Sequence, residues 1–385
     1  MQYRQFGRLE DKVSPLGFGM MRLPTRDNAP FSSDVYEDEA IAMLRYAIDN
    51  GVNYVDTAYP YHSGQSEVVT GRALKDGYRA KVRLATKSPV FLIQGAGDFD
   101  RFLEEQLCRL EDEYIDYYLL HALSGERWTD VVLRYDLLAK AERAKRAGKI
   151  GHIGFSYHDN RYENFLQIVD GYDGWEFCQI QLNYLDTENQ AGLAGLRYAA
   201  ARGLGVVVME PLLGGKLAAP PAKVRALWEA HPVQKSPVAW ALDWLWDMPE
   251  VSLLLSGMSD MRQTRENVAC AKAARVGMLT PEDAALMERV QAAFKAVESI
   301  PCTQCSYCMP CPSGVDIPKN FEAYNIGLMF EDRALARAEY ERLPVFGGPS
   351  AQAAFCVGCA ACEPKCPQGI DISRWMPVVR ETLGA

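Results

Sequence analysis

Long uninterrupted hydrophobic runs are absent from this sequence of 385 residues. The apolar stretch from Ser236 to Met258 is interrupted by Asp243, Asp247 and Glu250, whereas a membrane-spanning helix needs about 18 or more apolar residues in succession. The first residues, Met1 to Phe6, do not contain the apolar core of a secretory signal peptide. We therefore expect a cytoplasmic protein that has no contact with a membrane.

Positively charged residues are outnumbered by negatively charged residues. The chain has 41 Lys and Arg residues against 50 Asp and Glu residues, which gives a formal net charge of -9 at pH 7. A protein that binds nucleic acid concentrates Lys and Arg where the phosphates lie, so we expect no nucleic-acid partner. Hydrophobic residues at 48% and charged residues at 24% are typical of a folded globular protein.

Cysteine is scarce in the first 300 residues and abundant after them. Only Cys108, Cys178 and Cys270 lie in the first part, and we expect them to be buried core thiols. The other eight of the 11 cysteines fall between Cys302 and Cys366. Disulfides are rare in a reducing compartment, so this dense group indicates bound metal.

The chain lacks the glycine pattern of a doubly wound nucleotide-binding sheet. Gly-x-Gly-x-x-Gly usually follows the first strand of such a sheet, and the segment from Gly17 to Arg22 has no third glycine. Short strand-like runs instead alternate with helical patterns over roughly the first 290 residues, which predicts a (β/α)8 TIM barrel in an α/β chain. The expected strands are Ser14–Gly19, Asn53–Thr57, Val82–Lys87, Ile115–His121, Ile150–Ser156, Phe177–Leu182, Gly205–Met209 and Val251–Ser256. The expected helices include Glu37–Asn50, Phe99–Leu110, Val131–Ala147, Tyr162–Val169, Gly192–Arg202 and Met261–Ala274.

The pattern changes near Val297, where strand-like runs stop and cysteine, proline and glycine become frequent. We therefore predict two domains, residues 1–296 as the barrel and residues 297–385 as a small, mainly α-helical domain. One helical stretch, Asn320–Leu343, separates its two cysteine groups. At the other end of the chain, Tyr3–Phe6 and Lys12–Val13 are expected to form a hairpin that closes the bottom of the barrel.

Four polar residues stand at or just after the ends of three consecutive expected strands. They are Asp56, Tyr61, Lys87 and His121, and chemistry in a barrel of this kind sits at the carboxyl ends of its strands. A Lys87–Asp56 ion pair beside Tyr61 favours the phenolate, so we expect a lowered tyrosine pKa. Tyr61 then donates a proton to a carbonyl oxygen while hydride reaches the carbon, and His121 donates a hydrogen bond to the same oxygen. Taken singly, each residue has an ordinary structural reading as a turn residue, a solvated strand end or one of 19 tyrosines.

These segments resemble the aldo-keto reductase family. Gly51 to Tyr61 (Gly-Val-Asn-Tyr-Val-Asp-Thr-Ala-Tyr-Pro-Tyr) is similar to the family signature, in which the acidic tyrosine lies five positions after the aspartate, and this spacing selects Tyr61 over Tyr59. Leu84–Lys87 and Leu119–His121 resemble the family's lysine and histidine strands. The resemblance covers roughly residues 1–290. It implies the tetrad above and an extended NADPH bound without a Rossmann fold.

The resemblance also implies a set of cofactor contacts, which fall at the ends of six strands. Ser156 and Gln179 correspond to the contacts with the nicotinamide carboxamide, and the glycines after the seventh strand let backbone N–H groups approach a pyrophosphate. The full set is Gly19, Met20, Arg22, Asp56, Ser156, Gln179, Glu210, Pro211, Leu212, Gly214, Gly215, Lys216, Ser256, Gly257, Met258, Ser259, Gln263, Glu266 and Asn267. NADPH-selective relatives often carry Lys and Arg where Gly257 and Gln263 stand, and Arg262 and Arg265 lie nearby, so NADP(H) and NAD(H) both stay open.

The cysteine-rich tail contains two runs of four cysteines. Cys302, Cys305, Cys308 and Cys311 precede Pro312, and Cys356, Cys359, Cys362 and Cys366 precede Pro367. The second run has the spacing of bacterial ferredoxins, in which the fourth cysteine binds the other cluster. We therefore assign Cys302, Cys305, Cys308 and Cys366 to one [4Fe-4S] cluster, and Cys356, Cys359, Cys362 and Cys311 to a second. The tail resembles that of iron–sulfur aldo-keto reductases with a ferredoxin-like domain. Two zinc sites are the structural alternative.

Three functions are compatible with these features. The first is an NAD(P)H-dependent carbonyl reductase or alcohol dehydrogenase acting on a small molecule. The second is an electron-transfer module that couples a nicotinamide, through a flavin, to a redox partner protein. The third is a regulatory barrel that senses nicotinamide. A nicotinamide passes two electrons as hydride and a cluster passes one, so the clusters are either structural or joined to the barrel by a group that splits the pair. The sequence leaves a homo-oligomer open.

Overall fold

The computed structural model describes residues 1–27, 32–297 and 299–384. The chain divides into two compact units, which are taken here one at a time. The barrel unit contains residues 1–217 and 238–280, and the second unit contains residues 218–237 and 281–385. The domain boundary near Val297 stays a prediction. Within the described ranges, no helix combines the length and the apolar character needed to cross a membrane.

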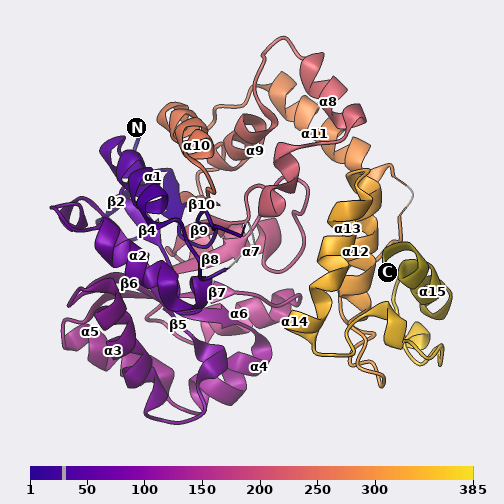
Figure 1. The fold of residues 1–385 in the computed structure, drawn as a ribbon, viewed down its shortest axis with the longest axis horizontal. Coiled ribbons are helices and arrows are strands. Elements are labelled where there is room, and N and C mark those ends of the chain that lie inside the picture. The colour runs from indigo at the N-terminus through magenta and orange to yellow at the C-terminus, as the bar shows by residue number, and fades with distance from the viewer. Residues whose placement is uncertain (28–31, 298, 385) are drawn as a thin grey trace. The chain divides into compact units, whose positions relative to one another are not determined.

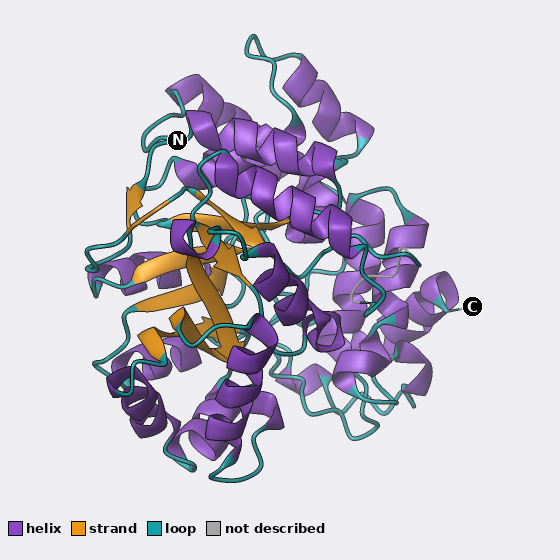
Figure 2. Cartoon of the chain, turned by 60° about the vertical axis from the view of Figure 1, so that its left-hand side comes forward, coloured by secondary structure: helices purple, strands orange, loops and turns teal. Residues whose placement is uncertain are grey.

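The barrel unit is a closed ring of eight parallel strands surrounded by helices (Figure 1, Figure 2). The strand order around the ring is β10-β3-β4-β5-β6-β7-β8-β9, and every neighbouring pair is parallel. The strands are β3 (Leu16–Gly19), β4 (Tyr54–Asp56), β5 (Arg83–Ser88), β6 (Ile115–Leu123), β7 (Ile150–Tyr157), β8 (Phe177–Gln181), β9 (Gly205–Met209) and β10 (Leu253–Gly257). This confirms the predicted (β/α)8 TIM barrel.

The helices of this unit follow the strands along the chain. They are α1 (Glu37–Asp49), α2 (Gln65–Ala73), α3 (Asp98–Leu110), α4 (Gly125–Arg127), α5 (Leu137–Arg146), α6 (Tyr162–Asp170), α7 (Gly192–Ala201), α9 (Pro237–Trp246) and α10 (Met261–Ala273). The single helix expected over Val131–Ala147 was wrong in extent. Residues Trp128–Leu133 form a π-helical segment. Asp136, at a φ of 54°, then interrupts the helical backbone before α5 begins.

Alternate residues of each strand face the interior of the barrel, because side chains in a strand point to opposite faces in turn. Tyr54, Ala85, Tyr117 and Leu119 belong to one buried inner cluster. Its floor is Phe6, whose ring lies edge-on to the Tyr117 ring at 5.0 Å between centroids. Phe6 directly follows β1 (Arg4–Gln5), which pairs antiparallel with β2 (Lys12–Val13) as the predicted hairpin.

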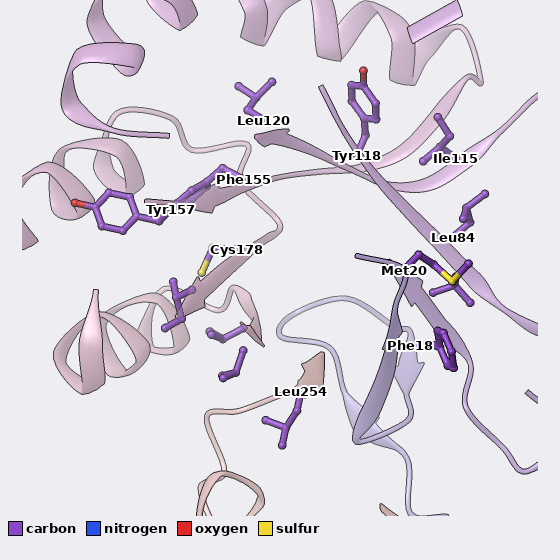
Figure 3. Close-up of a cluster of buried hydrophobic side chains, with 14 of the residues drawn as sticks. Phe18, Met20, Leu84, Ile115, Tyr118, Leu120, Phe155, Tyr157, Cys178 and Leu254 are labelled. Carbon is purple, nitrogen blue, oxygen red and sulfur yellow. The ribbon is translucent and has the colours of Figure 1, made fainter. Parts of the chain in front are cut away.

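The opposite residues of the same strands pack against the surrounding helices. Figure 3 shows part of this outer core, with Leu84 of β5, Tyr118 and Leu120 of β6, and Phe155 of β7. Cys178 is buried there, as expected, whereas Cys270 is half-buried and Cys108 is exposed. The expectation that all three scattered thiols are buried was therefore wrong for Cys108, which lies on the solvent side of α3.

The second unit is helical. Its helices are α8 (Ala222–Glu229), α11 (Pro281–Lys295), α12 (Ile317–Met329), α13 (Arg333–Glu341), α14 (Leu343–Gly347) and α15 (Ile372–Leu383). The single helix predicted over Asn320–Leu343 was wrong, because Glu331 adopts a φ of 53° and Asp332 caps a new helix by accepting a hydrogen bond from the Leu335 N–H. The helices α12 and α13 run side by side (Figure 1).

Candidate functional site

The polar residues predicted at the strand ends converge inside the mouth of the barrel. Asp56, Lys87 and His121 each stand two or four residues beyond an inner-core residue of the same strand, so they face inward as well. Lys87 Nζ donates to Asp56 Oδ1 at 2.6 Å and to the Tyr61 hydroxyl at 3.4 Å. The Tyr61 and His121 rings lie edge to face, 5.9 Å apart. The structure therefore brings all four residues together.

Tyr61 reaches this position through an unusual turn. It begins a short helical segment, Tyr61–Gly64, in which His62, Ser63 and Gly64 all have positive φ. The buried His62 ring holds the turn from the other side, because its Nδ1–H donates to the Ser32 carbonyl and its Nε2 accepts from the Leu23 N–H. Motif spacing alone did not identify His62 as a support.

Burial dominates the charge states in the mouth. It raises the pKa of Tyr61, and the nearby Lys87 ammonium only opposes this rise. The expected fall in the tyrosine pKa was therefore wrong, because desolvation of the half-buried phenol outweighs the cation. Burial also opposes the charge on Lys87, but Asp56 and Tyr61 outweigh it and hold the Lys87 pKa above its usual value. Tyr61 is thus a neutral phenol beside a charged ammonium. The neutral phenol is the form of tyrosine that can donate a proton.

His121 is held in its neutral form. Burial lowers its pKa well below the usual value, and the positive charges of Lys87, His158 and Arg127 lower it further. A neutral imidazole still has one N–H to donate. In the part of the chain that the structure describes, the buried His121 Nδ1, Asp56 Oδ2 and Gln179 Oε1 have no hydrogen-bond partner. Such buried orphan atoms are costly, so these three positions fit a polar ligand that completes their bonding.

A buried polar cluster supports Lys87 from behind. The carboxylate of Glu67 on α2 accepts from Thr86 Oγ1 and from Gln106 Nε2, both at 2.6 Å. Gln106 Nε2 also donates to the Lys87 carbonyl oxygen at 3.1 Å, and Arg109 Nη1 lies 3.3 Å from Glu67 Oε2. This Glu67 cluster joins α2, β5 and α3 beneath the lysine. The sequence patterns did not identify Glu67 as part of the site.

The predicted nicotinamide contacts lie on neighbouring strands. Ser156 on β7 and Gln179 on β8 occupy paired positions in the sheet register. The Ser156 hydroxyl accepts from the Ala122 N–H at 2.7 Å, which leaves its own hydrogen for a ligand. Met20 and Met258 differ from the other predicted contacts, because their side chains lie in the hydrophobic core and only their backbone can face a cofactor.

The loop after β9, where pyrophosphate contacts are predicted, has a backbone with several positive φ angles. Glu210, Leu213, Gly214 and Gly215 all have positive φ, and no atom of the described residues lies within 4 Å of where a Cβ at Gly215 would stand. A Cβ at Gly214 would lie 3.4 Å from Arg22 Nη2 and 3.6 Å from Lys216 Nζ. The Arg22 side chain also packs against Gly257, because a Cβ added at Gly257 would lie only 2.8 Å from Arg22 Cγ. Two cations and a glycine turn therefore meet here, as a pyrophosphate requires. Pro211 and Leu212 lie within the same loop.

The predicted adenosine segment follows β10. The Asn267 side chain donates to Ser256 Oγ at 2.9 Å, and Gln263 accepts from the Ser259 N–H at 2.9 Å. Arg262 lies 3.6 Å from Asp260 and 3.8 Å from Glu266. Its charge is therefore shared with two carboxylates, which weakens it as the partner of a 2′-phosphate.

In the second unit, the eight clustered cysteines line two separate cavities. One is lined by Cys302, Cys305, Cys308 and Cys366, and the other by Cys311, Cys356, Cys359 and Cys362. The fourth cysteine of each run thus lies with the first three of the other run. Ile317 and Ile372 line both cavities, so the two quartets are neighbours.

The two cysteine quartets can be compared with the ligand geometry of a single zinc ion and of an iron–sulfur cluster. Four thiolates around one zinc lie about 4 Å from one another, given Zn–S bonds of about 2.3 Å. Across the described ranges, no three His, Cys, Asp or Glu side chains converge as the ligands of one ion would. The quartets surround cavities instead, and four thiolates around a larger body fit an iron–sulfur cube.

A parallel barrel with a buried lysine, tyrosine and histidine at its mouth is the framework of a nicotinamide-linked oxidoreductase. Residues 15–291 match the model of the aldo/keto reductase family, and residues 301–370 match that of a 4Fe-4S dicluster domain. The first match covers more than half of the chain, so this protein belongs to the aldo-keto reductase family and carries a C-terminal 4Fe-4S domain. Members of the family use NAD(P)H.

The chain is similar to curated and solved members of the family. L-galactose dehydrogenase of Arabidopsis thaliana is 28% identical over 291 residues, 70% of this chain and 88% of that protein. A probable aldo-keto reductase of Glycine max is 33% identical over 153 residues, 38% of this chain and 42% of that protein, so less than half of that relative is matched. The holo form of an aldo-keto reductase from Bacillus halodurans shares the fold, with a TM-score of 0.61 and 24% identity over 75% of this chain and 96% of that one.

Proposed function

We propose that this protein reduces the carbonyl group of a small molecule with NAD(P)H, or oxidises the corresponding alcohol. The observation that carries the proposal is the contact of Lys87 Nζ with both Asp56 and the Tyr61 hydroxyl inside the barrel mouth, next to His121. A neutral phenol, a charged ammonium and a neutral imidazole are the groups that carbonyl reduction needs.

In this proposal, the protein binds and protonates the substrate oxygen. Reduced nicotinamide, when bound, would supply hydride for the carbonyl carbon, so that the carbonyl oxygen gains negative charge. Tyr61 gives its hydroxyl proton to that oxygen, which is a far stronger base than a phenolate, and the alcohol forms. The Lys87 ammonium stabilises the phenolate left behind, and solvent returns the proton. His121 holds the oxygen by a hydrogen bond before and during the transfer.

The residues that would hold the cofactor form a continuous path along the barrel rim. Asp56, Ser156 and Gln179 would take the nicotinamide end, and the orphan oxygens of Asp56 and Gln179 support this. Arg22, Lys216 and the glycine loop would take the pyrophosphate. The two carboxylates beside Arg262 favour NAD(H) as an accepted cofactor alongside NADP(H).

We further propose that the second unit binds two [4Fe-4S] clusters. Cys302, Cys305, Cys308 and Cys366 would hold one, and Cys311, Cys356, Cys359 and Cys362 the other, because each quartet lines one cavity. The tetrad contains no group that splits a hydride, so carbonyl reduction does not use them directly.

A second candidate function, one-electron exchange with a partner protein, has one feature in its favour. Cys359 is exposed and Val357, two residues earlier, is 73% exposed, so the quartet containing Cys359 has one side open to solvent. Electron transfer to a partner requires such access. The two functions differ in whether a carbonyl compound is needed for cofactor oxidation.

The test combines metal analysis with turnover. The protein is purified anaerobically, iron and sulfide are measured, and oxidation of NADH and NADPH is followed with a panel of aldehydes and ketones. The proposal predicts eight iron atoms per chain, about four per cluster, and cofactor oxidation that depends on an added carbonyl. Tyr61→Phe should lower kcat by about a thousandfold.

Tyr59→Phe is the matched control, because Tyr59 lies two residues away and its hydroxyl donates to Glu105 instead. It should keep near-normal turnover. Carbonyl-dependent oxidation that survives intact in Tyr61→Phe, or cofactor oxidation that needs no carbonyl in any variant, would contradict the reductase proposal. Zinc without sulfide would contradict the cluster proposal.

A further inference from the structure

A half-buried arginine stands beside the barrel mouth. Arg127 ends the short α4 segment that follows β6, and its Nη1 donates to the Ala122 carbonyl oxygen at 2.6 Å. Burial lowers the pKa of Arg127, and Glu126 and Asp159 oppose this from a distance. Among the residues that the structure describes, the acceptor that this guanidinium contacts is the Ala122 carbonyl, and Glu126 and Asp159 act on it only through their charge. A partly desolvated cation without a paired anion is costly to maintain.

The arginine lies near the catalytic histidine rather than on a remote surface. Ala122, which Arg127 contacts, directly follows His121 and has a φ of 54°. Its N–H is held by Ser156 and its carbonyl by Arg127, so both sides of this strained residue are fixed. Backbone strain held in place next to a reactive side chain is typical of a functional site.

An aromatic ring lies between the two groups. The Phe91 ring centroid is 5.6 Å from the Arg127 guanidinium carbon and 5.5 Å from the His121 ring centroid. Phe91 is 40% exposed, so it offers an apolar surface at the mouth. The Arg127 charge reaches His121, because it is one of the positive charges that lower the His121 pKa.

We infer that the substrate carries a carboxylate, or a similar anion, a few bonds from its carbonyl group. The carbonyl oxygen would lie at Tyr61 and His121, the body of the molecule would cover Phe91, and the anion would pair with the Arg127 guanidinium. A guanidinium binds a carboxylate through two parallel hydrogen bonds, which gives both energy and orientation. The inference rests on the proposed carbonyl reduction and adds the class of substrate.

The test compares 4-carboxybenzaldehyde with its methyl ester, in which the negative charge is removed and one methyl group is added. The holoenzyme should show a kcat/KM for the acid about 30-fold above that for the ester, and added salt should reduce this ratio. Arg127→Gln should abolish the preference and leave turnover of the ester within a few-fold. Arg127→Lys should keep part of the preference, because it retains the charge without the two-point geometry.

Arg134→Gln is the matched control. It removes a positive charge a few residues later, where Arg134 lies 5.4 Å from the Tyr135 ring centroid and is exposed, and it should leave the acid preference unchanged. Equal turnover of acid and ester by the wild type would overturn the inference. So would an Arg127→Gln variant that slows both aldehydes equally, since that marks a role in supporting Ala122. If no aldehyde promotes cofactor oxidation, the proposed function itself fails.

Discussion

At the scale of single residues, the charge state of His121 has a consequence for stability. Its pKa is far below the usual value of about 6.5 in the folded protein. Below about pH 6.5 this histidine binds a proton in the unfolded chain but not in the folded protein. Folding is therefore disfavoured as the pH falls. At pH 8 both states are neutral and the effect vanishes.

We therefore predict that the free energy of unfolding of the wild type falls more steeply below about pH 6.5 than that of His121→Gln. Urea unfolding of both proteins between about pH 5 and pH 8 measures this. His62 also has a lowered pKa, but it is present in both proteins and cancels in the comparison. Parallel pH profiles would contradict a neutral, buried His121.

The tetrad residues could be predicted from sequence because each obeys a local rule. Asp56, Lys87 and His121 lie at or near strand ends, and Tyr61 was selected by the resemblance to the family signature, in which the tyrosine lies five positions after the aspartate. The direction of the Tyr61 pKa could not be predicted in this way, since it depends on how completely the surrounding chain excludes water. Arg127 and Phe91 were missed for a similar reason, because loops carry no periodicity that shows which side chains meet.

At the scale of elements, the Glu67 cluster determines how firmly the helices α2 and α3 hold β5. Burial raises the pKa of Glu67, while Thr86, Gln106 and Arg109 oppose the rise, so this carboxyl depends on its partners. Replacing it by alanine removes the acceptor of the buried Thr86 hydroxyl and the carboxylate that Gln106 and Arg109 share, so Gln106 keeps only its weaker contacts and Arg109 loses its buried anion.

We predict that Glu67→Ala lowers the free energy of unfolding by about 3 kcal/mol. Glu67→Gln should cost less, because its amide oxygen still accepts from Thr86 and Gln106. Chemical denaturation of the three proteins gives these values. A loss in Glu67→Ala below about 1 kcal/mol, the scale of one exposed pair, would show that the cluster contributes little.

The strands were more predictable than the helices. Parallel barrel strands are buried on both faces and form short β-branched runs, so their positions follow from composition. The breaks in the predicted helices at Asp136 and Glu331 involve single residues at positive φ. The periodic spacing of hydrophobic residues continues across such a residue, so the pattern does not show the break. Only the second break has a signal in the sequence, because Asp332 is a typical N-cap residue at the start of α13.

At the scale of the whole molecule, the two units should depend differently on metal. The second unit has a small apolar core, and several of its cysteines pack against it. Binding of metal by such a unit is part of its folding free energy. The barrel has its own large core and contains no predicted cluster ligand.

Anaerobic removal of iron from the full chain should therefore expose the second unit to protease and leave the barrel resistant. Limited proteolysis with mass spectrometry would place the new cleavage sites after residue 297, with the iron-loaded protein as the control. Cleavage spread through the barrel strands, or an unchanged pattern after complete loss of iron, would contradict this dependence.

The most direct test of the account follows the hydride itself. Reduced nicotinamide carrying deuterium at the transferred position of C4 is oxidised by the anaerobic holoenzyme with an aldehyde, and the alcohol is analysed by mass spectrometry. Direct transfer beside Tyr61 predicts one deuterium at the former carbonyl carbon for each nicotinamide oxidised. An alcohol that has gained a solvent hydrogen in place of deuterium at that carbon would contradict the account, because the electrons would then have reached the substrate by another route.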